Sequence, residues 1–255
     1  SLNSSLTATN PNVSVYSLVN NEWSQLANIE SGSSFDYFGY STSLSSDGKT
    51  LAVGGFYGEL GSATDNAGYV KIFENVNGNF TQVGDALTGD NTNGDEFGFS
   101  VDLSSDGSIV AVSSAQGGDV FVYQRNGNNW SQLGDTIAFL DYSSDTKPSS
   151  IRKQEAVVQT KLSEDGNYLA IGSPNADVGG LNNGLIKVYQ NISNSWVQVG
   201  SDIVGQNLSH FGSFIDIEED SNGFLTLAAA GTTENSESYV NIYKLINSEW
   251  ISFVS

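Results

Sequence analysis

The chain of 255 residues contains no cysteine, no methionine, one histidine and three prolines. Without cysteine, disulfides, thiolate metal sites and cysteine catalysis are excluded. The single histidine, His210, leaves a serine hydrolase only one candidate general base. No apolar run approaches the roughly 18 residues of a membrane-spanning helix, so we expect no direct membrane insertion.

Basic residues are also scarce, with 9 Lys and Arg against 29 Asp and Glu and a formal charge of -20. Such a surface repels phosphate backbones and anionic membranes, which argues against nucleic acid as a partner. The chain begins at Ser1 without a signal peptide, so we expect a processed chain or a fragment. Acidic, cysteine-free chains rich in Asn, Ser, Thr and Gly are common among secreted bacterial proteins. We therefore expect an extracellular or cell-surface location.

The sequence does contain a repeat, which begins with a strand-like V-x-V-Y cluster. The five copies begin at Val13, Val70, Val120, Ile186 and Val240. In each copy an aromatic residue follows seven positions after the Tyr or Phe; these residues are Trp23, Phe80, Trp130, Trp196 and Trp250. The segment between them is rich in Asn and Gly, so each copy predicts a β-hairpin.

A second motif precedes the hairpin. The stretch FGYSTSLSSDGKTLAVGG from Phe38 is matched by FGFSVDLSSDGSIVAVSS from Phe97. A third copy from Val157 has lost its Phe-Gly, and a fourth from Phe211 is more divergent. Each copy predicts two strands joined at Asp-Gly, because Gly supplies a positive φ and Asp caps the turn.

One repeat therefore holds four strands, and the aromatic positions recur at spacings of 57, 50, 66 and 54 residues. Four antiparallel strands in such a repeat are typical of a propeller blade. We predict an all-β fold, a single β-propeller domain over 1–255 with five four-stranded blades, the first incomplete at the N-terminus. The expected blades span about 1–30, 31–86, 87–137, 138–203 and 204–255. The alternative is a fragment of a six- or seven-bladed propeller.

These motifs resemble the FG-GAP repeats of integrin α-subunits and many bacterial surface proteins. The resemblance rests on Phe38-Gly39, Phe97-Gly98 and Phe211-Gly212 and on the runs VGG, VSS, IGSP and AAAG, where the family has Gly-Ala-Pro. The sequence pattern of the repeat is also similar to that of tandem repeats in secreted marine and flavobacterial proteins. The resemblance implies extracellular ligand binding or adhesion, often with calcium.

The family's calcium loop would lie between the first two strands of a blade, where alternate oxygen ligands converge on the ion. The first three copies of the Asp-Gly motif retain one carboxylate there, which favours a plain turn. The fourth copy retains Glu218, Asp220 and Asn222, although no acidic residue follows at the expected distance. These three residues are the candidate ligands for Ca²⁺, the only cofactor that the sequence suggests.

Departures from the repeat indicate where a ligand would bind, because function gathers on loops over a rigid frame. The longest insertion, 137–156, carries two aromatic and three basic candidates, all expected to be exposed; these are Phe139, Tyr142, Lys147, Arg152 and Lys153. The loops from Gly54 and Gly172 occupy the same connection of their blades. We expect Phe56 and Tyr57 in the first of them to be exposed as well.

Three functions remain open at this stage. The first is a non-catalytic propeller that binds a protein or glycan on a surface, as in adhesion. The second is a structural subunit of a bacterial surface or secretion complex, because an incomplete first blade leaves an open edge for a partner. The third is a carbohydrate-active enzyme, although no carboxylate pair recurs in a distinctive setting. We expect no enzymatic activity.

Overall fold

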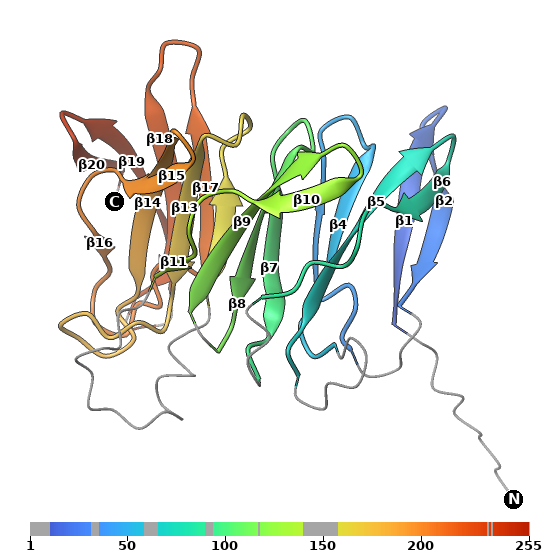
Figure 1. Ribbon diagram of the computed structural model, residues 1–255. Helices are drawn as coiled ribbons and strands as arrows, with labels where there is room; N and C mark the ends of the chain where they lie inside the picture. Colours follow the sequence, from blue (N-terminus) through green and yellow to red (C-terminus); the bar gives the residue numbers. More distant parts are fainter. Residues whose placement is uncertain are drawn as a thin grey trace, which may run out of the picture.

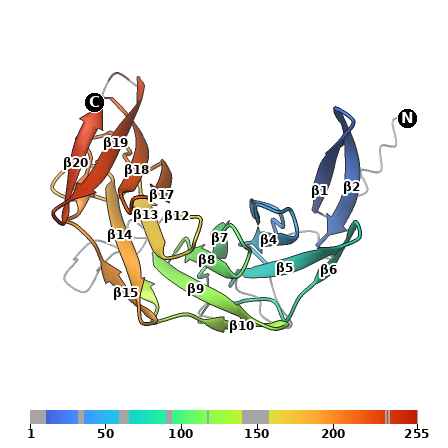
Figure 2. The same cartoon turned by 90° about the horizontal axis from the view of Figure 1, so that it is seen from above.

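The computed structural model describes residues 11–31, 36–58, 66–89, 94–116, 118–139, 158–233, 235 and 237–254. They form five antiparallel sheets that stand side by side in chain order (Figure 1). Seen from above, the sheets follow an open arc, with the first and the last sheet at its two ends (Figure 2). No helix in these residues is long and apolar enough to cross a membrane.

The predicted all-β propeller with repeated blades is confirmed. Blade 1 comprises β1 (Asn12–Val19) and β2 (Glu22–Glu30). Blade 2 comprises β3 (Ser41–Leu44), β4 (Thr50–Gly55), β5 (Tyr69–Val76) and β6 (Asn79–Gln82). Blade 3 comprises β7 (Phe97–Leu103), β8 (Ile109–Ser114), β9 (Asp119–Asn126), β10 (Asn129–Gln132) and β11 (Ile137–Ala138).

Blade 4 comprises β12 (Gln159–Leu162), β13 (Tyr168–Ser173), β14 (Leu185–Ile192), β15 (Ser195–Gln198) and β16 (Ile203–Val204). Blade 5 comprises β17 (Phe214–Glu219), β18 (Leu225–Thr232), β19 (Ser238–Ile246) and β20 (Glu249–Val254). In blades 2 to 5 the main strands pair in chain order, as the repeat predicts. The short strands β11 and β16, which pair back onto β9 and β14, were not predicted.

The Asp-Gly motifs are turns. The Asp47, Asp106 and Asp165 carboxylates each accept a hydrogen bond of 2.9 Å from the backbone N–H two residues later. Each following glycine has a φ near +70°. Neighbouring turns are also linked, because Ser46 N–H donates to the Ser105 carbonyl (2.9 Å) and Ser105 N–H donates to the Glu164 carbonyl (2.7 Å). The motif thus joins blades 2, 3 and 4 by backbone hydrogen bonds.

The Phe-Gly motif also connects blades. The phenylalanines are buried, with Phe38, Phe97 and Phe211 exposed by 4%, 0% and 1%. The glycine that follows Phe97, Gly98, has a φ of +90° and lies directly against blade 2, since a Cβ on Gly98 would meet the Tyr69 carbonyl oxygen at 2.5 Å. Only glycine allows both this backbone conformation and this approach. The motif is therefore part of the wedge between adjacent blades.

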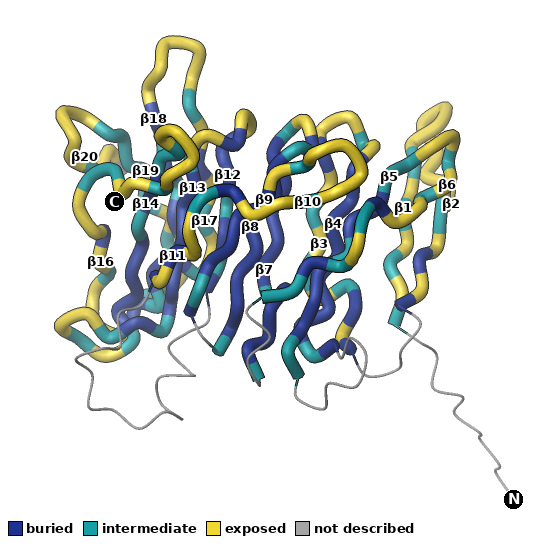
Figure 3. The backbone as a smooth tube through the Cα atoms, in the orientation of Figure 1, coloured by how far each residue is buried: buried dark blue, intermediate teal, exposed yellow. Residues whose placement is uncertain are grey.

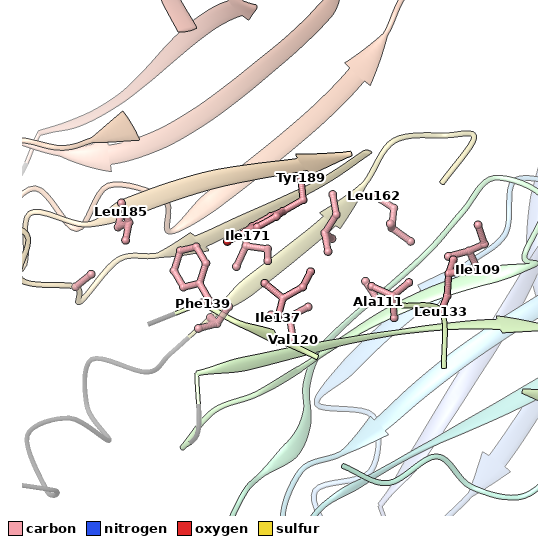
Figure 4. Packing of buried hydrophobic residues seen from close by; sticks show 14 residues of the cluster. Ile109, Ala111, Val120, Leu133, Ile137, Phe139, Leu162, Ile171, Leu185 and Tyr189 are labelled. Atoms are coloured by element: carbon pink, nitrogen blue, oxygen red, sulfur yellow. The ribbon is translucent and has the colours of Figure 1, made fainter. Parts of the chain in front are cut away.

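Blade 4 replaces the missing Phe-Gly in an unexpected way. Phe139 is fully buried, at 0% exposed, between blades 3 and 4 (Figure 4). The Lys187 ammonium lies 5.4 Å from its ring centroid, as the Lys71 ammonium lies 5.8 Å from Phe38 in blade 2. Phe139 therefore occupies the place of the motif phenylalanine. The prediction that it is exposed was wrong, because the blade wedge needs an aromatic side chain whatever segment supplies it.

Candidate functional site

Five aromatic side chains gather beside the place where β4 ends and β7 begins. These two strand ends lie at the lower edge of blades 2 and 3 in Figure 1. We call the five side chains the aromatic cluster; its members are Tyr37, Tyr40, Phe56, Tyr57 and Phe99. Phe56 stands at its centre. The Phe56 ring centroid lies 5.3, 4.5, 4.6 and 5.7 Å from those of Tyr37, Tyr40, Tyr57 and Phe99.

Exposure separates the members of the cluster. Phe56 is only 8% exposed, so the prediction of a solvent-exposed Phe56 was wrong: the four surrounding rings cover it. Tyr57 is half-buried. Tyr37 and Tyr40 are 57% and 55% exposed, although both rings rest on Phe56. The buried Phe56 ring thus supports the rings of Tyr37 and Tyr40, which remain exposed to solvent.

Hydrogen-bonding groups lie beside the cluster. The Glu96 carboxylate, on a residue that is 9% exposed, accepts hydrogen bonds from the Gln116 amide and the Tyr57 hydroxyl. The negative charge of Glu96, aided by burial, raises the pKa of Tyr57 above its ordinary value, so the phenol stays protonated as a donor. The Gln116 Oε1 atom is buried and has no hydrogen-bond partner among the described residues.

The backbone explains why these residues project together. The residue before each Phe-Gly motif has a left-handed conformation: Tyr37, Glu96 and His210 have φ values of +52°, +56° and +45°. Such conformations are costly for residues other than glycine and cluster at functional sites. His210 reaches back to blade 4, with its Nδ1 atom 3.2 Å from Asn175 Oδ1, as Glu96 reaches back to Tyr57 of blade 2. The same repeat position therefore lines one rim of the arc.

The sequence located only part of this site. It singled out Phe56 and Tyr57, and it missed Tyr37, Tyr40, Phe99, Glu96 and Gln116. Their common signal was available: most flank a Phe-Gly motif or follow the second strand of a blade, so the propeller ring brings them to one end. The other predicted ligand residues, Tyr142, Lys147, Arg152 and Lys153, lie outside the described residues.

The predicted calcium site gains no support from the geometry. Asp220 Oδ1 accepts a hydrogen bond from the Asn222 backbone N–H (2.8 Å), as the aspartates of the other turns do from the residue two positions later, and a second one from the Phe224 N–H (3.0 Å). Glu218 and Asn222 are exposed. Within the described part of the chain, no group of three or more acidic or histidine side chains is arranged to hold a metal ion. Asp220 serves as a turn cap.

No known family profile matches the chain, and no curated protein matches it. The resemblance to FG-GAP repeats therefore rests on the motifs alone. Solved structures do match. A 6-phosphogluconolactonase candidate from Bacteroides uniformis is 15% identical with a TM-score of 0.59, over 94% of this chain and 63% of that one.

Two further structures match in the same way. The periplasmic gluconolactonase of Pseudomonas aeruginosa is 16% identical with a TM-score of 0.51, over 94% of this chain and 62% of that one. A protein of unknown function from Desulfotomaculum acetoxidans is 11% identical with a TM-score of 0.57, over 94% and 61%. The lactonase-type structures are seven-bladed β-propellers. The chain thus shares their fold and spans less than two thirds of their length.

Proposed function

We propose that this protein is a non-catalytic, extracellular binding propeller whose ligand contacts the aromatic cluster. The observation that carries the proposal is the exposure of Tyr37 and Tyr40, which rest on the buried Phe56. Fixed aromatic rings offer apolar contact area at little cost in conformational entropy, because the folded chain already holds them in place. Monomeric proteins seldom expose such rings in a group without a use for them.

Of the two ligand classes expected from the sequence, a neutral glycan fits this surface better than a protein. Sugar rings stack on aromatic faces, and their hydroxyl groups need donors and acceptors nearby. The exposed Tyr37 and Tyr40 carry phenolic hydroxyl groups that can donate and accept such hydrogen bonds at the surface, next to their aromatic faces. The formal charge of -20 opposes an anionic ligand. A neutral polysaccharide is therefore the ligand that the site favours.

The test is a glycan array followed by calorimetry with the best neutral oligosaccharide. We expect Tyr37→Ala and Tyr40→Ala each to weaken binding by about three- to tenfold, since an aromatic contact contributes roughly 0.5–1.5 kcal/mol. Tyr16→Ala is the matched control. Tyr16 is equally exposed, at 54%, but lies on β1 in blade 1, away from the cluster.

Several outcomes would contradict the proposal. Binding that Tyr16→Ala weakens as much as Tyr40→Ala would place the ligand elsewhere. A protein partner that is lost with Tyr37→Ala, together with a blank glycan array, would replace the glycan by a protein ligand. The solved structures include gluconolactonases, so lactone hydrolysis by the purified chain, lost on Glu96→Gln, would contradict a non-catalytic role.

A further inference from the structure

Blade 5 exposes a sheet face that every interior blade buries. In each V-x-V-Y strand the first and third residues point to the next blade. In blades 2 to 4 these residues are at most 2% exposed; they are Val70, Ile72, Val120, Val122, Ile186 and Val188. Their equivalents in blade 5, Val240 and Ile242, are 57% and 36% exposed. We call this side of blade 5, with the neighbouring Phe214, the trailing face.

Other residues of the trailing face are likewise exposed in blade 5 and covered at the equivalent positions of blade 2. A groove of about 360 Å³ lies along it, lined in part by Phe214, Ala230 and Val240, and Phe214 is 78% exposed. In blade 2 the matching residues meet blade 3 directly. The Ser41 hydroxyl donates to the Gly98 carbonyl (2.7 Å), and Gly54 abuts the same glycine. The face of blade 5 is thus half of an inter-blade junction.

Blade 1 exposes the other half, the face that interior blades turn to the preceding blade. We call it the leading face and define it by Tyr16 and Trp23, which are 54% and 70% exposed. The equivalent Tyr123 and Tyr189 are each 9% exposed. Two of the three Trp equivalents also bond across the junction: Trp196 Nε1 donates to the Leu133 carbonyl (2.9 Å), and Trp250 Nε1 donates to the Val199 carbonyl (3.1 Å). The Trp130 Nε1 atom is buried without a hydrogen-bond partner among the described residues.

The arc itself indicates what covers these faces. It follows the curvature of seven-bladed propellers over 94% of this chain, but it spans only 63% of the Bacteroides uniformis structure. A second copy fits poorly, because two copies would bring together ten sheets where such a ring holds seven, and each carries a charge of -20. A blade that docks on blade 5 must instead present its Tyr and Trp to the trailing face. A blade that docks on blade 1 must present the two apolar residues of its V-x-V strand to the leading face.

We propose that the trailing face of blade 5 and the leading face of blade 1 are docking surfaces for further four-stranded blades of this same repeat, which close a seven-bladed ring. Each added blade would turn its Tyr and Trp toward the blade before it, as blades 3 to 5 do. Burial of the apolar face drives the docking, as at every interior junction, and a Trp-to-carbonyl hydrogen bond adds to it, as at the junctions between blades 3 and 4 and between blades 4 and 5.

The chain has no cysteine, so a single introduced thiol reports the accessibility of one position. Val240→Cys marks the trailing face, and Ile186→Cys, at a position that is 0% exposed, is the matched buried control. Labelling by a maleimide is measured in the chain as it is and in a chain extended after Ser255 by a second copy of 86–138. A second extension, by a copy of 202–255, repeats the experiment with a different added blade.

We expect Val240→Cys to react fast in the original chain and about tenfold or more slowly in both extended chains, because reaction then requires local opening. Ile186→Cys should react slowly in all three. Unchanged labelling of Val240→Cys beside a folded extension would overturn the proposal. An added blade that stays protease-sensitive would also overturn the proposal, because docking on the trailing face should order that blade. Protection of the original chain that rises with its concentration would assign the face to a second copy instead.

Discussion

The junction between blades 2 and 3 and the trailing face of blade 5 carry the same residues in opposite surroundings. Val70 and Ile72 are 0% and 2% exposed, whereas Val240 and Ile242, at the same repeat positions, are 57% and 36% exposed. Figure 3 colours the two strands that carry them, β5 and β19, by burial. The repeat therefore specifies the residue type, while the neighbouring blade decides whether that residue contributes to stability. Substitutions made in pairs at equivalent positions test this difference.

The largest effect is expected for Ile72→Ala. Ile72 packs in the cluster that contains Phe97 and Phe121, so its truncation leaves a cavity and should lower the free energy of unfolding by about 2–5 kcal/mol. Ile242→Ala should cost less than about 1 kcal/mol, because its side chain already meets solvent. Urea denaturation measures both. Equal losses in the two variants would show that the trailing face is covered in solution.

A smaller effect is expected for the tryptophans. Trp196→Phe removes the indole donor to the Leu133 carbonyl and should lower the free energy of unfolding by about 1 kcal/mol. Trp23→Phe should change it by less than about 0.5 kcal/mol, since Trp23 is 70% exposed. Chemical denaturation gives the two energies. Quenching of tryptophan fluorescence by iodide tests the difference in exposure. The quenched fraction should fall more in Trp23→Phe than in Trp196→Phe, because iodide reaches exposed indoles.

The smallest effect is a pH dependence at Asp102, which joins three blades. Its carboxylate accepts hydrogen bonds from Leu162 N–H (2.7 Å) and Ser43 Oγ (3.3 Å) and pairs with Lys161 (3.2 Å). Burial raises the pKa of Asp102, although the Lys161 charge opposes that shift.

Because the folded pKa of Asp102 lies above the unfolded one, the folded chain binds the proton more tightly, and the ionised carboxylate costs stability at neutral pH. That cost fades as the pH falls through the folded pKa. The parent should therefore gain stability relative to Asp102→Asn between about pH 7 and pH 4. The exposed equivalent, Asp216→Asn, is the control. If the free energy of unfolding followed the same pH dependence in the parent and in Asp102→Asn, the predicted cost of the buried Asp102 charge would be contradicted.

Much of the fold could be read from the sequence because repetition multiplies a weak signal. One V-x-V-Y run with a later Trp is a plausible hairpin, but five in the same phase indicate an array of blades. The Asp-Gly turns were equally legible, because their geometry depends on adjacent residues alone. The short strands β11 and β16 were missed, since two residues that pair across a sheet leave no local pattern.

The site could be predicted only in part, because exposure depends on neighbours that are distant in sequence. Phe139 and Phe56 stand in loop-like segments, which made both of them candidates for an exposed surface. Phe139 fills the blade wedge, and four rings from three segments enclose Phe56. Tyr37 and Tyr40 flank a Phe-Gly motif, which places them at one end of the blade, but the sequence does not show that the ring of Phe99 from another blade packs on Tyr40 and completes the cluster.

The sequence by itself determined the blade: its four strands, their order, the Asp-Gly turn and the aromatic residue of each hairpin. Those features arise from alternation and turn chemistry within about 50 residues. Only the tertiary structure decided which faces are covered, because burial of a β-sheet face requires a second sheet about 10 Å away. That is why Val70 and Val240, alike in every local respect, are 0% and 57% exposed.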